Sequence, residues 1–258
     1  MRIDLHITPH QTDELMLRDR VVVVVDVLRA STTIVTALKN GAREIIPVTT
    51  VERAVKISGS LFGDAILRGG ERHGKMIEGF NLGNSPTEYS EDRVRGKAII
   101  FSTTNGSLAI ERARYARTLF VCGFVNISAV ADLLRHMSAD FTIVCAGNNG
   151  TLSLEDTVCA GMLVRKLADE KSLDIVFADG ALAAVTLYRS FSRGLLKMIK
   201  GTEHGRYLAG IGFGDDLPLA AAVDAIPVVP QLVGNVIKLR AEGDRRDAPA
   251  APMTAQTT

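Results

Sequence analysis

The first chemically capable side chains stand where a strongly apolar run ends. Asp26 and Arg29 follow five consecutive valines, Val21–Val25, and Ser31 comes two residues later. A carboxylate, a guanidinium and a hydroxyl can together handle an anion and the metal ion that accompanies it. The valine run is typical of a strand buried on both faces of a parallel sheet. Because ligands of open α/β sheets bind beyond the carboxyl ends of strands, this position predicts a binding site.

Two further polar turns follow apolar runs. Residues 102–106 read Ser-Thr-Thr-Asn-Gly, and residues 146–151 read Ala-Gly-Asn-Asn-Gly-Thr. Backbone N–H groups at a helix start attract phosphate or sulfonate, and glycine lets the backbone approach the ligand closely. Helix capping explains one such turn alone, but three at adjacent strand ends favour a shared anion site. The candidate ligand contacts in these turns are Ser31, Thr103, Thr104, Asn105, Gly106 and Gly147.

The charged pair after the valine run has several possible roles. An arginine beside a buried strand needs an anionic partner, which for Arg29 is either Asp26 or a ligand. We favour a ligand, because a salt bridge alone rarely sits at a strand's carboxyl end. Asp26 could cap the next helix, bind a divalent cation or act as a base.

A long polar, glycine-rich loop is predicted over residues 69–85. Loops of this length within compact domains are often functional. Glu71 and Arg72 are its best chemical candidates, whereas His73 is as readily explained as an exposed side chain. Residues 85–88, Ser-Pro-Thr-Glu, have the form of a capping box with proline at its first helical position, which indicates a structural role.

A second acidic site is indicated by residues 153–156, Ser-Leu-Glu-Asp. Asp156 completes a capping box and needs no further role. Glu155 points about 100° away around the helix. It could therefore reach a metal ion or a water molecule, although a structural role explains it equally well. Asp215 and Asp216 could form another metal pair, but capping of the helix that follows explains them better.

Apolar runs and helical periodicity alternate along the first two thirds of the chain. The predicted strands are Ile3–Ile7, Arg20–Val25, Glu44–Val48, Ala65–Arg68, Ala98–Ser102, Thr118–Cys122 and Phe141–Cys145. The predicted helices cover 31–39, 51–61, 105–115, 126–137 and 154–169. This alternation predicts a three-layer α/β/α fold with a largely parallel or mixed sheet.

The pattern changes after Lys171. Residues 173–200 read as helical with a break near 192–194, and shorter helices are predicted at 203–210 and 215–224. Prolines in residues 226–239 favour an edge strand or a connection over a central strand. We expect two intimately packed α/β parts, 1–125 and 126–240, without a linker between them. We expect residues 241–258, rich in Ala, Pro, Asp, Arg and Thr, to be disordered.

Composition limits the class of protein. The chain has 258 residues, of which 47% are hydrophobic and 23% charged, as in ordinary soluble globular proteins. A net charge of +1, with no basic run among aromatics, argues against nucleic acid or an anionic membrane as partner. Cys122, Cys145 and Cys159 lack metal-ligand spacing and read as small buried residues in a reducing compartment. No signal peptide or membrane-spanning run is evident, so we expect a cytoplasmic protein. Apolar helices after residue 173 leave room for a homodimer interface, though core packing explains them as well.

Several phosphatase mechanisms do not match these turns. An aspartyl-phosphate enzyme would show Asp-x-Asp, but Leu28 stands two residues after Asp26. A cysteine phosphatase loop needs Cys-x5-Arg, but Thr151 stands six residues after Cys145. Neither a Walker phosphate loop nor a Gly-x-Ser-x-Gly elbow is found. The chemistry that remains is metal-assisted attack by water, with arginine and backbone N–H groups holding the phosphoryl oxygens.

Five motifs, in order, resemble the 2-phosphosulfolactate phosphatase family, ComB. They are Asp-Val-Leu-Arg-Ala-Ser-Thr-Thr (26–33), Gly-Glu-Arg (70–72), Gly-Phe-Asn-Leu-Gly-Asn-Ser-Pro (79–86), Ser-Thr-Thr-Asn-Gly (102–106) and Cys-Ala-Gly…Leu-Glu-Asp-Thr-Val-Cys-Ala-Gly (145–161). The resemblance extends over about residues 1–240. It implies an unusual ComB-like α/β fold with its site between the two parts of the chain.

The resemblance also implies an activity. This is magnesium-dependent hydrolysis of 2-phospho-3-sulfolactate to 3-sulfolactate and phosphate, a step of coenzyme M biosynthesis in methanogens. On that basis Asp26 and Glu155 would help to hold Mg²⁺. Arg29 and residues 103–105 would hold the phosphoryl group. Arg72 and Asn81 would bind the carboxylate or sulfonate, and Glu71 or Glu155 would be the general base. Hydrolysis of another phosphorylated hydroxy acid, or anion sensing without catalysis, remain alternatives.

Overall fold

The valine run forms strand β2 (Val21–Val25), and all five of its residues are buried. Its first, third and fifth valines pack into one hydrophobic cluster, and its second and fourth into another. Successive side chains of a strand point to opposite faces of a sheet, so β2 has helices on both sides. It pairs in parallel with β7 (Thr118–Cys122) and β8 (Phe141–Cys145). The prediction of a strand buried on both faces is confirmed.

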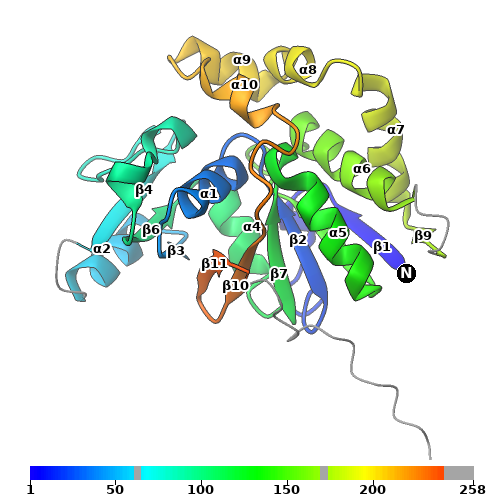
Figure 1. The fold of residues 1–258 in the computed structure, drawn as a ribbon, viewed down its shortest axis with the longest axis horizontal. Helices are drawn as coiled ribbons and strands as arrows, with labels where there is room; N and C mark the ends of the chain where they lie inside the picture. The colour runs from blue at the N-terminus through cyan, green and yellow to red at the C-terminus, as the bar shows by residue number, and fades with distance from the viewer. Residues whose placement is uncertain (61–64, 169–173, 241–258) are drawn as a thin grey trace, which may run out of the picture.

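The computed structural model describes residues 1–60, 65–168 and 174–240. In these residues an 11-stranded mixed sheet has the order β5-β4-β6-β3-β11-β10-β7-β2-β8-β1-β9 (Figure 1). The remaining strands are β1 (Arg2–His6), β3 (Glu44–Pro47), β4 (Ile66–Arg72), β5 (Lys75–Met76), β6 (Ala98–Ser102), β9 (Val176–Phe177), β10 (Pro230–Val233) and β11 (Val236–Leu239). With helices on both faces, the three-layer α/β/α prediction is confirmed. The expected disordered tail, 241–258, lies outside the described residues.

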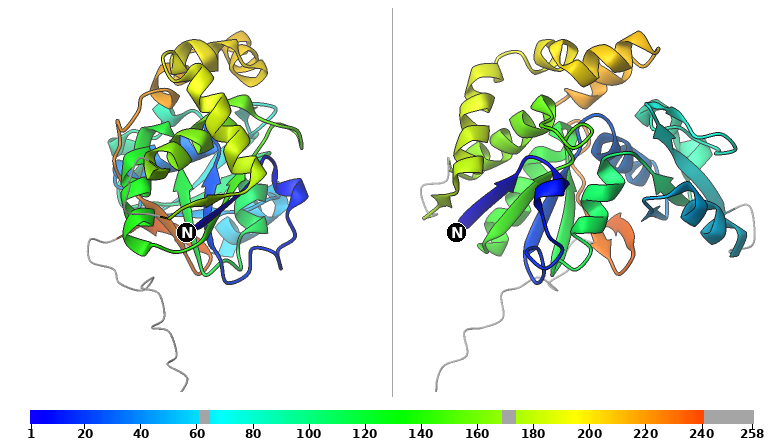
Figure 2. Two further views of the ribbon diagram at one scale, coloured as in Figure 1. Left: turned by 90° about the vertical axis from the view of Figure 1, so that its right-hand side faces the viewer. Right: turned by 180° about the vertical axis from the view of Figure 1, so that it is seen from behind.

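Helices follow most of the parallel strands. They are α1 (Ala30–Lys39), α2 (Val51–Ser60), α3 (Glu91–Val94), α4 (Gly106–Arg112), α5 (Ile127–Met137), α6 (Leu154–Ala168), α7 (Asp179–Phe191), α8 (Leu195–Gly201), α9 (Glu203–Gly210) and α10 (Asp216–Ala220). Short 3₁₀ turns occur at Pro9–Gln11, Pro86–Glu88 and Phe124–Asn126. In Figures 1 and 2, α8, α9 and α10 extend as an arm across one end of the sheet.

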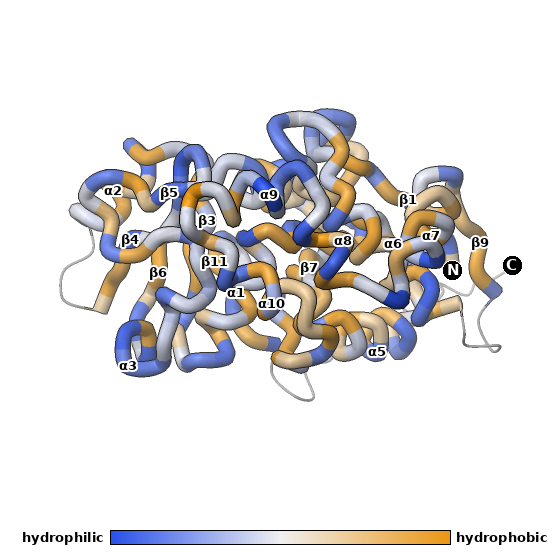
Figure 3. Tube along the Cα trace, turned by 90° about the horizontal axis from the view of Figure 1, so that it is seen from above, coloured by the Kyte–Doolittle hydropathy of each residue, from blue (hydrophilic) through white to orange (hydrophobic). Residues whose placement is uncertain are grey.

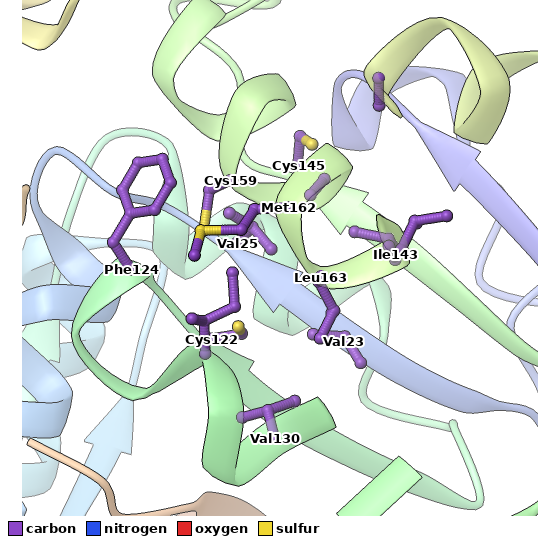
Figure 4. Packing of buried hydrophobic residues seen from close by; sticks show 14 of the residues in the cluster. Val23, Val25, Cys122, Phe124, Val130, Ile143, Cys145, Cys159, Met162 and Leu163 are labelled. Carbon is purple, nitrogen blue, oxygen red and sulfur yellow. The ribbon is translucent and has the colours of Figure 1, made fainter. Parts of the chain in front are cut away.

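The two faces of the sheet have separate hydrophobic clusters. Helices α5, α6 and α7 cover the face that holds the larger cluster, in which Cys122, Cys145 and Cys159 are free and buried (Figure 4). The prediction of small buried thiols is confirmed, and burial raises the pKa of Cys145 and of Cys159 above the usual thiol range. Helices α1 and α4 pack on the opposite face.

Residues in the central layer are more hydrophobic than residues at the periphery of the molecule. In Figure 3 the central strand β7 is hydrophobic, whereas the short peripheral helix α3 is hydrophilic. Among the described residues, no helix combines the length and the apolar character needed to cross a bilayer.

The prediction for residues 226–239 was wrong in its placement. Strands β10 and β11 form an antiparallel hairpin in the middle of the sheet, between β7 and β3. Its pairing to each neighbour rests on one residue pair, Gln231 with Phe120 and Ile237 with Ile45. Proline is compatible with this position because Pro230 is the first residue of β10, where no ladder N–H is needed.

Three other predictions need correction. Strand β4 runs to Arg72, so the start of the predicted loop at residues 69–85 is strand, followed by the β4–β5 hairpin. Glycine at position 69 of this strand leaves room for the Tyr89 side chain, because a Cβ there would lie 2.3 Å from the Tyr89 hydroxyl. The predicted helix over 173–200 contains the short strand β9 before α7, although its break near 192–194 is confirmed. Helix α10 ends at Ala220 rather than at residue 224.

A glycine controls how closely α6 and α7 pack. A Cβ at Gly161 of α6 would lie 2.0 Å from the carbonyl oxygen of Ala184 in α7. Because backbone atoms cannot move aside cheaply, Gly161→Ala is expected to destabilise the fold by about 1–3 kcal/mol. Urea unfolding measures this change. Gly59→Ala in α2 is the control, because a Cβ there meets nothing within 4 Å. Equal stability of the two variants would contradict the packing argument.

Candidate active site

A cavity of about 400 Å³ opens at the carboxyl ends of β2, β6 and β8, between the β4–β5 hairpin and α9. Six residues predicted from the sequence line it: Asp26, Arg29, Glu71, Thr103, Thr104 and Asn105. The other lining residues are Leu28, His73, Gly74, Asn84, Asn148, Asn149, Glu203, His204 and Tyr207. The strand-end turns singled out in the sequence therefore meet at one cavity.

The sequence predicted that the three turns follow adjacent strands, and the structure shows that they do not. Strand β6 is separated from β2 by four other strands, although β2 and β8 are neighbours. The turn after β6 nevertheless lies beside the other two turns, as two contacts show. Asn105 Oδ1 accepts a hydrogen bond from the Asn149 amide at 3.2 Å. A Cβ on Gly106 would lie 2.6 Å from Asp26 Oδ2, so glycine permits this close approach.

Asp26 lines the cavity and is nearly inaccessible to solvent. The pKa of Asp26 is raised to about 6, chiefly by burial and also by the nearby carboxylates of Glu71 and Glu155, while His204 and the Ala30 amide oppose the shift. Its Oδ1 accepts the Ala30 amide hydrogen bond at 3.1 Å, so it helps to begin α1. A buried carboxylate among other carboxylates is a group that a cation would stabilise.

Behind Asp26 lie two more buried carboxylates at the start of α6. The Ser153 hydroxyl accepts the Asp156 amide, as the predicted capping box requires. The Asp156 carboxylate, however, accepts amide hydrogen bonds from Val27 at 2.8 Å and Gly147 at 3.1 Å. It thereby ties together the turns after β2 and β8, a role that the capping prediction missed. Burial and the nearby carboxylates raise the pKa of Asp156 well above its usual range.

Glu155 is the second predicted metal partner. Its Oε1 is fully buried and has no hydrogen-bond partner among the described residues. The imidazole Nδ1 of His204 lies 3.5 Å from that oxygen. A buried carboxylate oxygen without a donor is costly unless something else occupies the place.

Glu71 forms one wall of the cavity. Its Oε1 accepts the Thr104 amide at 2.7 Å, and its Oε2 accepts the Gly74 amide at 2.8 Å and the Thr104 hydroxyl at 3.3 Å. These bonds join the β4–β5 hairpin to the turn after β6. The Thr103 amide is also occupied, because it donates to the Ser107 hydroxyl. Two backbone donors that the sequence suggested for an anion are therefore used within the protein.

Arg29 pairs with an acidic residue, Asp216, that is neither of the two partners predicted for it, Asp26 or a ligand. Its Nη1 donates to Asp216 Oδ2 at 2.8 Å, and the two side chains are 2% and 3% exposed. Its Nη2 donates to the Gly74 carbonyl at 2.6 Å, and the guanidinium lies over the Phe213 ring. Asp216 Oδ1 accepts the Ser85 hydroxyl. Ser85 and Asp216 thus belong to a buried hydrogen-bond network. No side-chain hydrogen bond caps the helix that begins near either residue, so the capping roles predicted for them are wrong.

The other predicted site residues lie behind or beside the cavity. The Ser31 hydroxyl accepts the Asp26 amide, and Gly147 takes a left-handed backbone conformation in the turn after β8. Arg72 donates to the carbonyl oxygens of Thr49, Glu71 and Ser102 and to the Ser102 hydroxyl. Asn81 is exposed, and its Oδ1 accepts the Arg68 amide.

Helix α9 contributes residues that sequence reasoning missed. Glu203, His204 and Tyr207 line the cavity, and the Tyr207 hydroxyl donates to the His73 carbonyl at 2.9 Å. This contact joins α9 to the β4–β5 hairpin across the cavity mouth. No motif marks these residues. Only the N-cap at Thr202, whose hydroxyl accepts the Gly205 amide, is readable from local sequence.

Comparison with known proteins gives the family. A family model described as 2-phosphosulpholactate phosphatase matches residues 6–235. The chain belongs to this family. A relative from Caldanaerobacter subterraneus subsp. tengcongensis, named "Probable 2-phosphosulfolactate phosphatase", is 38% identical over 92% of this chain and 98% of its own length. A Thermotoga maritima relative with the same name is 40% identical over 86% of this chain and 92% of its own.

Membership in the 2-phosphosulpholactate phosphatase family identifies the class of enzyme, a phosphoric monoester hydrolase. The match includes every strand-end turn that lines the cavity and the whole arm from α8 to α10. The cavity therefore lies within the part of the chain that this family shares.

Proposed function

We propose that the chain hydrolyses 2-phospho-3-sulfolactate to 3-sulfolactate and phosphate, with Mg²⁺ as cofactor. The observation that carries the proposal is an acidic cavity at the strand ends of a chain that matches this family over residues 6–235. The names of the relatives supply the substrate, and the cavity supplies a reason for the cation.

The charges of ligand and cavity require a cation between them. The substrate carries phosphate, carboxylate and sulfonate groups, all of them anionic. Asp26, Glu71 and Glu203 are acidic lining residues, while the charge of Arg29 is already paired with Asp216. An anion of this kind would be repelled by such a wall unless a positive ion lay between the two.

The residues present fit Mg²⁺. Asp26 and Glu155 would hold it, since carboxylate oxygens are its preferred ligands and Glu155 Oε1 accepts no hydrogen bond from any residue that the structure describes. Within residues 1–60, 65–168 and 174–240, no group of three or more His, Cys, Asp or Glu side chains is arranged as a metal site. Mg²⁺ commonly binds through one or two carboxylates, with water and substrate phosphate as its other ligands. When bound, it offsets phosphoryl charge and activates water.

The protein's own groups would orient the substrate. Arg29 retains N–H donors beyond the two used by Asp216 and Gly74, and the Thr103 and Asn105 side chains lie on the same cavity. Both oxygens of Glu71 already accept hydrogen bonds. We therefore assign Glu71 to the cavity wall rather than to proton transfer.

Magnesium removal is the direct test. Phosphate release from 2-phospho-3-sulfolactate is expected to need Mg²⁺ and to fall by about a hundredfold or more in excess chelator, because the cation supplies charge stabilisation that the paired Arg29 does not. Colorimetric phosphate measurement follows the reaction. Phospholactate without the sulfonate tests the substrate assignment. Full turnover in chelator would contradict the magnesium proposal, and ligand binding without turnover would support an anion sensor.

A further inference from the structure

Asn84 is a buried polar side chain that the fold does not use. The residue is 4% exposed and lines the cavity. Its Oδ1 is fully buried without a hydrogen-bond partner in the described part of the chain. No hydrogen bond from its Nδ2 to any described residue occurs either. Buried carboxamides are normally paired, so an unpaired one beside a cavity calls for an explanation.

The backbone around this side chain is, in contrast, firmly held. The Thr33 hydroxyl donates to the Asn84 carbonyl at 2.8 Å. On one side, the Gly83 amide donates to Glu88 Oε2 at 2.7 Å. On the other, the Ser85 hydroxyl donates to buried Asp216. A fixed main chain that presents an unpaired side chain is the arrangement of a pre-organised binding residue.

The surroundings indicate what Asn84 binds. The described residues that line the cavity include the carboxylates Asp26, Glu71 and Glu203 but only one arginine, Arg29, and Asp216 and Gly74 already engage both of its Nη atoms. A substrate whose phosphate, carboxylate and sulfonate oxygens are all acceptors needs further donors. A carboxamide N–H is a donor that brings no charge into the site.

We propose that Asn84 is a substrate-binding residue: its Nδ2 donates a hydrogen bond to an anionic oxygen of the phosphorylated hydroxy acid, and its Oδ1, which accepts nothing from the described residues, accepts from a bound water or from the hydroxyl that hydrolysis frees. This inference rests on the proposed function for the identity of the ligand. It adds to the site a residue from the segment between β5 and the 3₁₀ turn Pro86–Glu88, in addition to those from the strand-end turns.

Two substitutions test the inference. Asn84→Ala removes the donor, and its KM for 2-phospho-3-sulfolactate is expected to rise about tenfold to a hundredfold, the usual effect of losing a hydrogen bond to a charged group. Asn84→Asp keeps the shape but replaces the donor by an acidic group, and a still larger rise is expected. Isothermal titration calorimetry with the product, 3-sulfolactate, which the enzyme does not consume, gives a Kd that is independent of turnover.

The control is Asn40→Ala at the end of α1. Asn40 Nδ2 donates to the Tyr89 carbonyl at 2.8 Å, so this variant loses a structural carboxamide away from the cavity. Its KM is expected to stay unchanged, and circular dichroism confirms the fold of each variant. An unchanged KM and Kd in Asn84→Ala, or tighter binding in Asn84→Asp, would overturn the inference. If the unmodified chain releases no phosphate, the proposed function fails, and the Kd comparison alone then judges Asn84.

Discussion

Asp26→Asn is expected to lower phosphate release by about a hundredfold or more, because it removes a buried negative charge at the place where a cation would bind. The substitution keeps the side-chain shape and an oxygen that can accept the Ala30 amide, so α1 should still begin normally. Phosphate release measured over a range of Mg²⁺ concentrations tests this prediction. Weaker magnesium dependence, with the half-saturating concentration moved upward, is the expected signature.

Asp132→Asn on α5 is the matched control. Asp132 is exposed and pairs with Arg135 one helical turn away, so its charge affects neither the cavity nor the core. Its activity should equal that of the unmodified chain. Activity of Asp26→Asn within a few-fold of this control would show that Asp26 neither binds a cation nor takes part in the reaction.

Asp216→Ala is expected to destabilise the fold by about 3–5 kcal/mol, since it leaves the buried guanidinium of Arg29 without its counter-charge. The Ser85 hydroxyl would lose its acceptor at the same time. The free energy of unfolding from urea titration gives the change directly.

A double substitution separates stability from catalysis. Arg29→Met combined with Asp216→Leu removes both charges and fills the space with apolar atoms, which often restores stability. The double variant is therefore expected to unfold near the urea concentration of the unmodified chain and yet to release little phosphate. If Asp216→Ala alone costs under 1 kcal/mol, the ion pair contributes little to the fold. If the double variant keeps full activity, Arg29 has no part in the reaction.

The sequence predicted where the strands begin and end more successfully than it predicted which strands pair with one another. Strands β6, β7 and β8 begin and end at the predicted residues, because buried β-branched runs are a strong local signal. The central position of β10 and β11 depended on pairing with β7 and β3, and no local pattern encodes such a pairing. The prolines suggested an edge strand, but proline is also tolerated at the first residue of a strand, where Pro230 lies.

The site divides in the same way. Asp26, Arg29 and Thr103 could be predicted because each follows an apolar run, at the carboxyl end of a buried strand. Asp216 was missed as the partner of Arg29 because 187 residues separate the two. His204 was missed because a lone histidine in an amphipathic helix gives no signal until the chain folds α9 over the strand ends.

The central hairpin also has a consequence for synthesis of the chain. Asp26 follows a strand on one side of β10–β11, whereas Glu71 lies in a strand on the other side and Thr103 follows a strand there. Residues 230–239, among the last that the structure describes, thus join the two groups of strands that carry these cavity residues (Figure 1). A polypeptide ending before Pro230 would leave β7 and β3 as unpaired edges, open to association with other chains. During translation the cavity residues carried by β2, β4 and β6 can therefore reach their final separation only after this late segment leaves the ribosome.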